Sequence, residues 1–191
     1  MKTSNKEITD ILKALVIISL AFGIASVESF SAANIVLLVL ISAITAGTGF
    51  LLHELGHKII AQRYGCWAEF RSFDNFFIIT ILLSFLGVVF AAPGAVFIHG
   101  NVTKSQNGKI SVIGPIVNIA LAILFIGIYF VGTPLFTLLG KQGALINSWL
   151  AIFNMIPVWN LDGAKVFIWN KLVYFTTIAA GILLFIVSIM V

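Results

Sequence analysis

Long runs of apolar residues dominate the pattern of hydrophobic and polar positions along the chain. Five of these runs approach the ~20 residues that one crossing of a bilayer requires, and they cover residues 11–27, 34–62, 114–132, 143–158 and 172–191. A sixth apolar run, 76–92, is long enough either to span or to enter and leave on one face. The pattern therefore predicts an all-α integral membrane protein with five transmembrane helices and one ambiguous segment.

The distribution of basic residues favours a re-entrant path for the run 76–92. If this run crosses the membrane, the eleven Lys and Arg residues divide seven against four between the two sides. If it is re-entrant, ten lie on the side of the N-terminus and only Lys141 lies opposite. The second distribution is the one that the positive-inside rule expects, with the N-terminus in the cytosol.

Composition agrees with a membrane protein and excludes several other classes. Residues 1–191 have the length of a single domain, and 60% of them are hydrophobic while only 9% are charged, which excludes an ordinary soluble domain or a disordered chain. The net charge of +4 comes from basic residues scattered at the ends of apolar runs. We therefore expect a lipid bilayer as a partner and no nucleic acid. A lone cysteine, Cys66, excludes an internal disulfide.

A short β-hairpin is expected after the sixth run, over about 95–113. Pro93-Gly94 breaks a helix, and Asn107-Gly108 lies between the short apolar runs 95–99 and 109–113. Asn-Gly between such runs is a hairpin signal. Non-helical backbone at membrane depth is tolerated only where protein or a water-filled cavity satisfies its polar groups, so the hairpin also predicts a cavity on the cytosolic side.

Candidate chemistry is concentrated in the second apolar run, which contains His53-Glu54-Leu55-Gly56-His57. Residues four apart share one face of a helix, so His53 and His57 are expected to ligate one metal ion. Glu54 projects about 100° away from His53 and is expected to act as general base on water. Ionisable groups inside an apolar helix are costly, which favours a functional role.

The third metal ligand is expected to be Asp162. His57 lies six residues before Arg63, hence about 9 Å inside the cytosolic end of its helix. In the five-helix topology, Asp162 lies near the same boundary, whereas a sixth span would move it to the opposite face. The longer HExxHxxGxxH pattern of metzincins fails, because Ile60 and Arg63 occupy its Gly and His positions. Three protein ligands and an open position are typical of catalytic zinc, so we expect one Zn²⁺ ion.

Three motifs together resemble the site-2 protease family of intramembrane zinc metalloproteases. They are the His53–His57 string, Gly114-Pro115-x-x-Asn118, and Asn154-x-x-Pro157-x-x-x-Leu161-Asp162-Gly163. The resemblance implies zinc held by His53, His57 and Asp162, with Glu54 as the base. It also implies that Asn154 binds the substrate backbone and that Asn118 lies near the active centre, which makes both substrate-binding candidates. The region 95–113 is similar to the family's membrane-associated β element, and we expect a minimal form of the family without PDZ or CBS modules.

The expected function is therefore endopeptidase cleavage in or near the transmembrane segments of other membrane proteins, that is, regulated intramembrane proteolysis. The expected location is the cell membrane, multi-pass, with the active site toward the cytosol. A non-catalytic metal-binding membrane adaptor or a transporter is the alternative, although the sequence has no repeat symmetry between its halves. Substrate identity, regulatory signal and oligomeric state stay open.

Overall fold

The computed structural model describes residues 3–27, 32–89, 93–158 and 160–191. Its helices are α1 Asn5–Ala25, α2 Ala32–Ser42, the π-helical turn η1 Ala43–Gly47, α3 Thr48–Arg63, α4 Asp74–Ser84, α5 Lys104–Tyr129, α6 Pro134–Asn154, α7 Asp162–Trp169 and α8 Lys171–Met190. The strands are β1 Trp67–Ser72 and β2 Gly94–His99.

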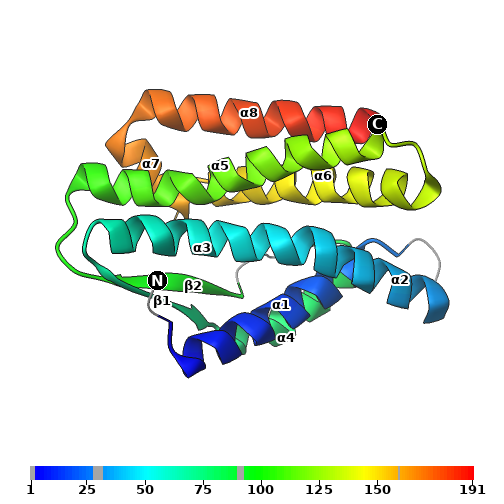
Figure 1. Ribbon diagram of the computed structural model, residues 1–191, viewed down its shortest axis with the longest axis horizontal. Coiled ribbons are helices and arrows are strands. Elements are labelled where there is room, and N and C mark those ends of the chain that lie inside the picture. The colour runs from blue at the N-terminus through cyan, green and yellow to red at the C-terminus, as the bar shows by residue number, and fades with distance from the viewer. Residues whose placement is uncertain (1–2, 28–31, 90–92, 159) are drawn as a thin grey trace.

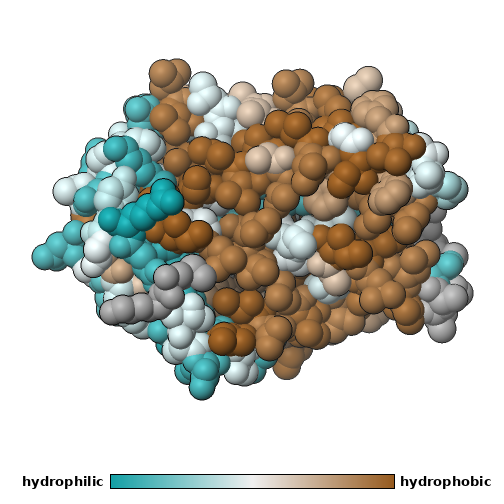
Figure 2. Space-filling model, in the orientation of Figure 1, coloured by the Kyte–Doolittle hydropathy of each residue, from teal (hydrophilic) through white to brown (hydrophobic). Residues whose placement is uncertain are grey.

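The long helices run side by side along the longest axis of the molecule (Figure 1). α1, α5 and α8 lead away from the end that carries the sheet, whereas α2–α3 and α6 return toward it. α5 packs against α3, α6 and α7 and so joins the two halves of the chain. In the view of Figure 2, hydrophilic residues gather at the end with the sheet, apolar residues cover most of the middle of the face, and a smaller group of polar residues lies at the opposite end.

Four helical stretches are long and apolar enough to cross a membrane: Asn5–Ala25, Asn34–Arg63, Lys104–Tyr129 and Lys171–Met190. Each corresponds to one of the expected spans. The remaining expected span, 143–158, corresponds to α6, which begins earlier at Pro134 because Thr133 caps its first turn and Pro134 occupies its start. α6 has 21 residues but carries Lys141, Gln142 and Asn147, which lower its apolar character.

The expected hairpin over 95–113 is wrong, although the protein does contain a small antiparallel sheet. β2 pairs with β1, from Trp67↔His99 to Ser72↔Gly94, and residues 109–113 lie inside α5. Thr103 and Gln106 form a capping box that starts α5 before the Asn107-Gly108 pair, so helix capping outweighs the turn signal. Gly108 serves helix packing instead, because a Cβ there would lie 2.4 Å from Trp169 of α7.

The sixth apolar run leaves the sheet and returns to it at the same place. The pair Ser72↔Gly94 closes the sheet at the point where the segment begins and ends. Its helix, α4, has only 11 residues and therefore extends about 16 Å, roughly half of the hydrocarbon thickness. α4 packs against α1. The last residues of the run, 90–92, lie outside the described part of the chain.

Candidate metal centre

The two histidines of α3 face the same side of that helix, as their spacing predicts. Their ring centroids lie 4.6 Å apart with the rings nearly perpendicular, and both side chains are buried. α3 continues directly from η1 and α2, so the histidines lie within one of the long apolar helical stretches. Their position allows both Nε2 atoms to meet a third group from the opposite half of the chain.

That third group is Asp162, the first residue of α7. The Oδ2 atom of Asp162 lies 3.3 Å from His53 Nε2 and 3.0 Å from His57 Nε2. The chain between α6 and α7 is not helical at Pro157, which cannot continue an α-helix. Gly163 packs so tightly on the end of α6 that a Cβ there would lie 2.1 Å from the Met155 carbonyl oxygen. The motif residues thus fold the chain back and direct Asp162 toward α3.

The spacing of these three groups fits a zinc ion. Zinc lies about 2.0–2.1 Å from nitrogen and oxygen ligands, so neighbouring ligand atoms of a tetrahedral site are about 3.3 Å apart. The two Nε2–Oδ2 distances of 3.3 and 3.0 Å are close to that value, and all three candidate ligand atoms lie within 4.8 Å of one another. Two imidazoles and one carboxylate are also ligands of the type that catalytic zinc sites use.

The second ring nitrogen of each histidine has its own buried partner. His53 Nδ1 lies 2.6 Å from Asn118 Oδ1, and His57 Nδ1 lies 2.7 Å from the Ile110 carbonyl oxygen. Both partners are acceptors, so each Nδ1 carries the proton and each Nε2 presents a lone pair to the metal site. α5 therefore fixes the tautomer of both imidazoles.

Gly114 of α5 lies directly against the metal-facing atoms. A Cβ at this position would be 2.5 Å from His53 Nε2 and 2.6 Å from His57 Nε2, well inside van der Waals contact. The glycine of the Gly114-Pro115-x-x-Asn118 motif thus has a steric reason, because any side chain there would occupy the space that the ligands and the ion need.

Asp162 is held in its charged form. Burial opposes ionisation, but whenever His57 and His53 are protonated, their charges and hydrogen bonds outweigh it and lower the pKa of Asp162 below its ordinary value. Lys165, one turn further along α7, places its Nζ 4.0 Å from the other carboxylate oxygen, Oδ1. The carboxylate is therefore ready to act as a metal ligand without first losing a proton.

Glu54 turns away from the three ligands and faces the sheet. Its Oε2 accepts a hydrogen bond of 3.1 Å from the backbone N–H of Val96 in β2. His53, Glu54, His57 and Asp162 line one cavity with a volume of about 610 Å³, whose other walls include β2 and apolar side chains such as Phe50, Phe73 and Phe97. The candidate base and the candidate ligands thus open onto a common space next to an extended strand.

The two asparagines that were expected to bind substrate occupy different environments. Asn154, at the end of α6, is partly exposed and lines the cavity, and its Nδ2 donates to the Leu150 carbonyl oxygen at 3.0 Å. Asn118 is fully buried, and its carboxamide bonds to His53, Gly49 and Asn147. Asn118 therefore touches a candidate metal ligand and adjoins the candidate centre, and the substrate contacts of both residues stay predictions.

Several residues of the site carry no motif signal. Asn147 of α6 touches Asn118 and is fully buried; an asparagine inside an apolar helix is itself a signal that sequence reasoning had available. The contribution of Ile110 is a backbone carbonyl, and that of Val96 is a backbone N–H, so the identity of these residues reveals nothing.

Comparisons with known proteins agree with the geometry. A protein of Methanocaldococcus jannaschii, whose name classes it provisionally as a zinc metalloprotease, is 39% identical over 175 residues, which are 90% of this chain and 88% of the relative. A protein of the same organism named zinc metalloprotease is 28% identical over 61% of the chain and 30% of its own length. A Synechocystis protein, also classed provisionally as a zinc metalloprotease, is 30% identical over 82% of the chain and 38% of its own length.

No family model matches the chain, and no solved structure matches it significantly. Among the described residues, the group His53, His57 and Asp162 is the arrangement of His, Cys, Asp and Glu side chains that fits a metal ion. With a relative that is 39% identical over nearly the full length of both proteins, the chain belongs to the family of zinc metalloproteases, and its cofactor is zinc.

Proposed function

We propose that the protein is an intramembrane endopeptidase of the site-2 protease type, which hydrolyses peptide bonds in or near the transmembrane segments of other membrane proteins in regulated intramembrane proteolysis. The observation that carries this proposal is the position of the ligand group. His53 and His57 lie on a helical stretch that is long and apolar enough to cross a membrane, and Asp162 meets them there. Buried ionisable groups at such a position are costly, and here three of them converge on one point as possible metal ligands, which favours a function.

The proposed topology has five crossings, by α1, α2–α3, α5, α6 and α8. The alternating directions of these helices support it, as does the position of the two termini at opposite ends of the bundle (Figure 1). α6 is included because it packs against both α5 and α8, and because Asn147, the polar residue in its middle, is buried and bonded to Asn118 of α5. Basic residues then gather at the end with the sheet, which the positive-inside rule assigns to the cytosol. The protein is thus a multi-pass protein of the cell membrane with a cytosol-facing site.

The residues around the cavity have separate tasks in the proposed reaction. When bound, zinc supplies a Lewis acid that polarises the scissile carbonyl and lowers the pKa of water at the site. Glu54 accepts the proton of the attacking water and later delivers it to the leaving amine. Asn154 faces the cavity with a carboxamide oxygen to which no described residue donates a hydrogen bond, so it is free to accept one from a substrate N–H.

The outer edge of β2 is the proposed docking site for an unwound substrate segment. Val96 and its partner Phe70 both direct their N–H groups away from each other, to Glu54 and to Glu7 respectively. In an antiparallel pair this makes Gly94 and Ile98, two residues to either side of Val96, point their backbone groups outward as well. β2 lines the cavity, so a substrate that adds to this edge as a strand would pass beside Glu54 and the ligands.

The test of the proposed function is Glu54→Gln, measured on the purified protein reconstituted with zinc and a set of single-span membrane proteins. Removal of the general base is expected to lower kcat by about 100- to 10,000-fold. Zinc content is expected to stay unchanged, because Glu54 is not among the ligand group. Asp74→Asn is the matched control: it makes the same change from carboxylate to amide at an exposed position and is expected to leave cleavage intact.

Cleavage by the Glu54→Gln protein at the rate of the wild type would remove the proposed mechanism. A wild-type protein that binds zinc but yields no zinc-dependent product from any of the substrates would favour the alternative, a non-catalytic metal-binding membrane adaptor.

A further inference from the structure

A chain of buried carboxamides extends behind the metal centre, from α3 through α5 to α6. Asn118 Oδ1 lies 2.6 Å from His53 Nδ1, and Asn118 Nδ2 donates to Asn147 Oδ1 at 3.0 Å. Both asparagine side chains are completely buried. Asn147 is therefore one hydrogen-bonded residue away from a metal ligand, although it comes from a helix that carries no ligand itself.

The direction of Asn118 matters because the two ends of a carboxamide are chemically different. Its oxygen must face His53, because His53 can ligate a metal through Nε2 only while Nδ1 keeps its proton. The Nδ1–H group then needs an acceptor, which the oxygen of Asn118 provides. Its nitrogen then faces two acceptors, Asn147 Oδ1 and the Gly49 carbonyl oxygen at 3.2 Å. A flipped Asn118 would set a donor against a donor at His53 and an oxygen against two oxygens on the other side.

The direction of Asn147 is fixed by groups that cannot flip. Its Nδ2 donates to the Gly143 carbonyl oxygen at 2.9 Å and to the Thr45 carbonyl oxygen at 3.3 Å. Thr45 lies in the π-helical turn η1, a kind of turn that is frequent at functional sites. Because both partners are backbone acceptors, the oxygen of Asn147 has to face Asn118, where an acceptor is required.

A glycine on α3 allows Asn147 of α6 to approach Asn118. A Cβ at Gly49 of α3 would lie 2.3 Å from Asn147 Oδ1, so only glycine allows Asn147 to approach α3 this closely. The carbonyl of the same glycine accepts a hydrogen bond from Asn118. The close approach thus brings Asn147 and Asn118 together at the level of His53, rather than merely joining two helices.

From this arrangement we infer that Asn147 is a positioning residue for the metal centre. It sets the direction of the Asn118 carboxamide, which in turn keeps His53 protonated at Nδ1 and presents Nε2 to zinc. The inference rests on the proposed role of His53 as a zinc ligand and adds a residue from α6 to the groups that determine zinc affinity. A merely structural role, in which Asn147 only joins helices, would affect folding and leave zinc affinity alone.

The first test compares the zinc affinity of purified full-length variants by competition with a chelator. Asn147→Leu keeps the size of the side chain but removes the acceptor for Asn118, and we expect zinc to bind roughly 10-fold more weakly, at the lower end of the range for groups that orient metal ligands. Ser148→Ala is the matched control. Ser148 is the next residue of α6 and is equally buried, and within the described part of the chain its hydroxyl donates only to carbonyls of its own helix, so its loss is expected to leave zinc affinity unchanged.

A second variant tests the inference if Asn147→Leu does not fold. Asn147→Ser can satisfy its hydroxyl on the Gly143 carbonyl one turn earlier, as Ser148 does on Ala144, but it is too short to reach Asn118. We expect the same loss of zinc affinity as for leucine. A folded Asn147→Leu or Asn147→Ser protein with the zinc affinity of the wild type would overturn the inference.

A double-mutant cycle separates action through Asn118 from a general effect on the bundle. Once Asn118→Ala has removed the intermediate residue, the further change Asn147→Leu is expected to cause no additional loss of zinc affinity. An equal loss in both backgrounds would overturn the inference, even if the wild type binds zinc and cleaves substrates as proposed. Failure of the wild type itself to bind zinc would instead remove the proposed metal centre, which keeps the two failures distinguishable.

Discussion

Two consecutive residues of α3, His57 and Lys58, are both buried but are surrounded in opposite ways. His57 faces α5 and α7, where its Nδ1 bonds to the neutral carbonyl of Ile110 and its Nε2 faces the metal site. Lys58 points about 100° away, and its Nζ lies 2.6 Å from Glu7 Oε2 of α1, with each side chain at most 1% exposed.

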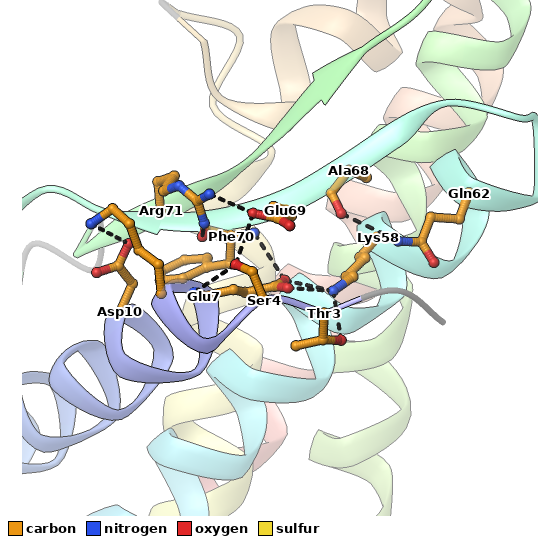
Figure 3. A network of polar contacts seen from close by, with 11 residues as sticks. Thr3, Ser4, Glu7, Asp10, Lys58, Gln62, Ala68, Glu69, Phe70 and Arg71 are labelled. Carbon is orange, nitrogen blue, oxygen red and sulfur yellow. Dashed lines mark hydrogen bonds and ion pairs between the residues drawn. The ribbon is translucent and has the colours of Figure 1, made fainter.

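The charge of Lys58 is balanced within the protein by the carboxylate of Glu7 (Figure 3). Lys58 Nζ donates to both carboxylate oxygens of Glu7 and to Thr3 Oγ1. Glu7 in turn accepts from the Phe70 N–H of β1 at 3.0 Å. This network therefore joins α1, α3 and β1, and it uses all three N–H donors of Lys58.

The comparison shows that burial of a polar group does not by itself indicate function. What distinguishes the metal face of α3 is that each histidine has one nitrogen satisfied by a neutral acceptor and one nitrogen left for the ion. We therefore expect substitutions at Lys58 and Glu7 to change stability, and substitutions at the metal face to change zinc affinity.

The largest expected effect is a loss of folding stability when one partner of the buried ion pair is removed and the other is kept. Glu7→Leu leaves the buried Lys58 ammonium without its counter-charge, which typically costs about 3–5 kcal/mol of folding free energy. Denaturant unfolding in detergent micelles is the measurement. Zinc affinity of the folded fraction is expected to stay close to that of the wild type, and a large loss of zinc affinity would contradict the separation of the two faces.

A substitution that crowds the metal face of α3 is expected to lower zinc affinity and to change stability much less. Gly114→Ala places a methyl group within 2.5–2.6 Å of both Nε2 atoms and is expected to weaken zinc binding by at least ~100-fold, measured by chelator competition. Gly127→Ala is the matched control in the same helix, because a Cβ there has no atom within 4 Å. Equal zinc affinity of the two variants would refute the steric role of Gly114.

A smaller effect is expected when both partners of the buried ion pair are replaced. Glu7→Leu combined with Lys58→Met removes the unpaired charge, and apolar replacement of a buried pair is often close to neutral. The Phe70 N–H still loses its acceptor, so a residual cost of about 1–3 kcal/mol is expected. If the double variant unfolds as readily as Glu7→Leu alone, the unpaired charge is not the cause of the loss.

The smallest effect is expected at the exposed pair Lys13–Asp74, whose Nζ and Oδ2 atoms are 2.8 Å apart. The hydrogen bond from Lys13, with a second one from Ser72, lowers the pKa of Asp74, so the interaction favours the folded protein at neutral pH and is lost as the pH falls. Lys13→Met is expected to raise the pKa of Asp74, followed by NMR titration of its carboxyl carbon, without a resolvable change in unfolding. An unchanged pKa would show that the pair does not form in solution.

The structure could be predicted from the sequence where the local spacing of residues determines the geometry. The i, i+4 spacing of His53 and His57 predicts a shared face, and charge counting together with membrane depth selected Asp162, which the structure places within 3.3 Å of both rings. Length and hydropathy located the long helices because lipid imposes a simple rule on them.

The structure could not be predicted from the sequence where it depends on contacts between segments that are distant in the chain. The hairpin prediction failed because the partner of β2 lies more than twenty residues earlier, in β1, and because the Thr103 cap begins a helix across the Asn-Gly pair. Pairing between distant strands leaves no periodic signal in a single segment. For the same reason, the buried pair of Glu7 and Lys58 and the contact between Asn118 and Asn147 became visible only in three dimensions.

The pairing at the end of the sheet allows the loop between its two strands to vary in length and sequence. Because Ser72 and Gly94 are cross-strand partners, the loop between them starts and finishes at one fixed anchor, and its length is independent of the distance from α3 to α7. Phe73 and Phe76 of this loop nevertheless form part of the cavity wall. Insertions, deletions or grafted sequences in this loop are therefore expected to change this part of the cavity wall while His53, His57 and Asp162 keep their positions.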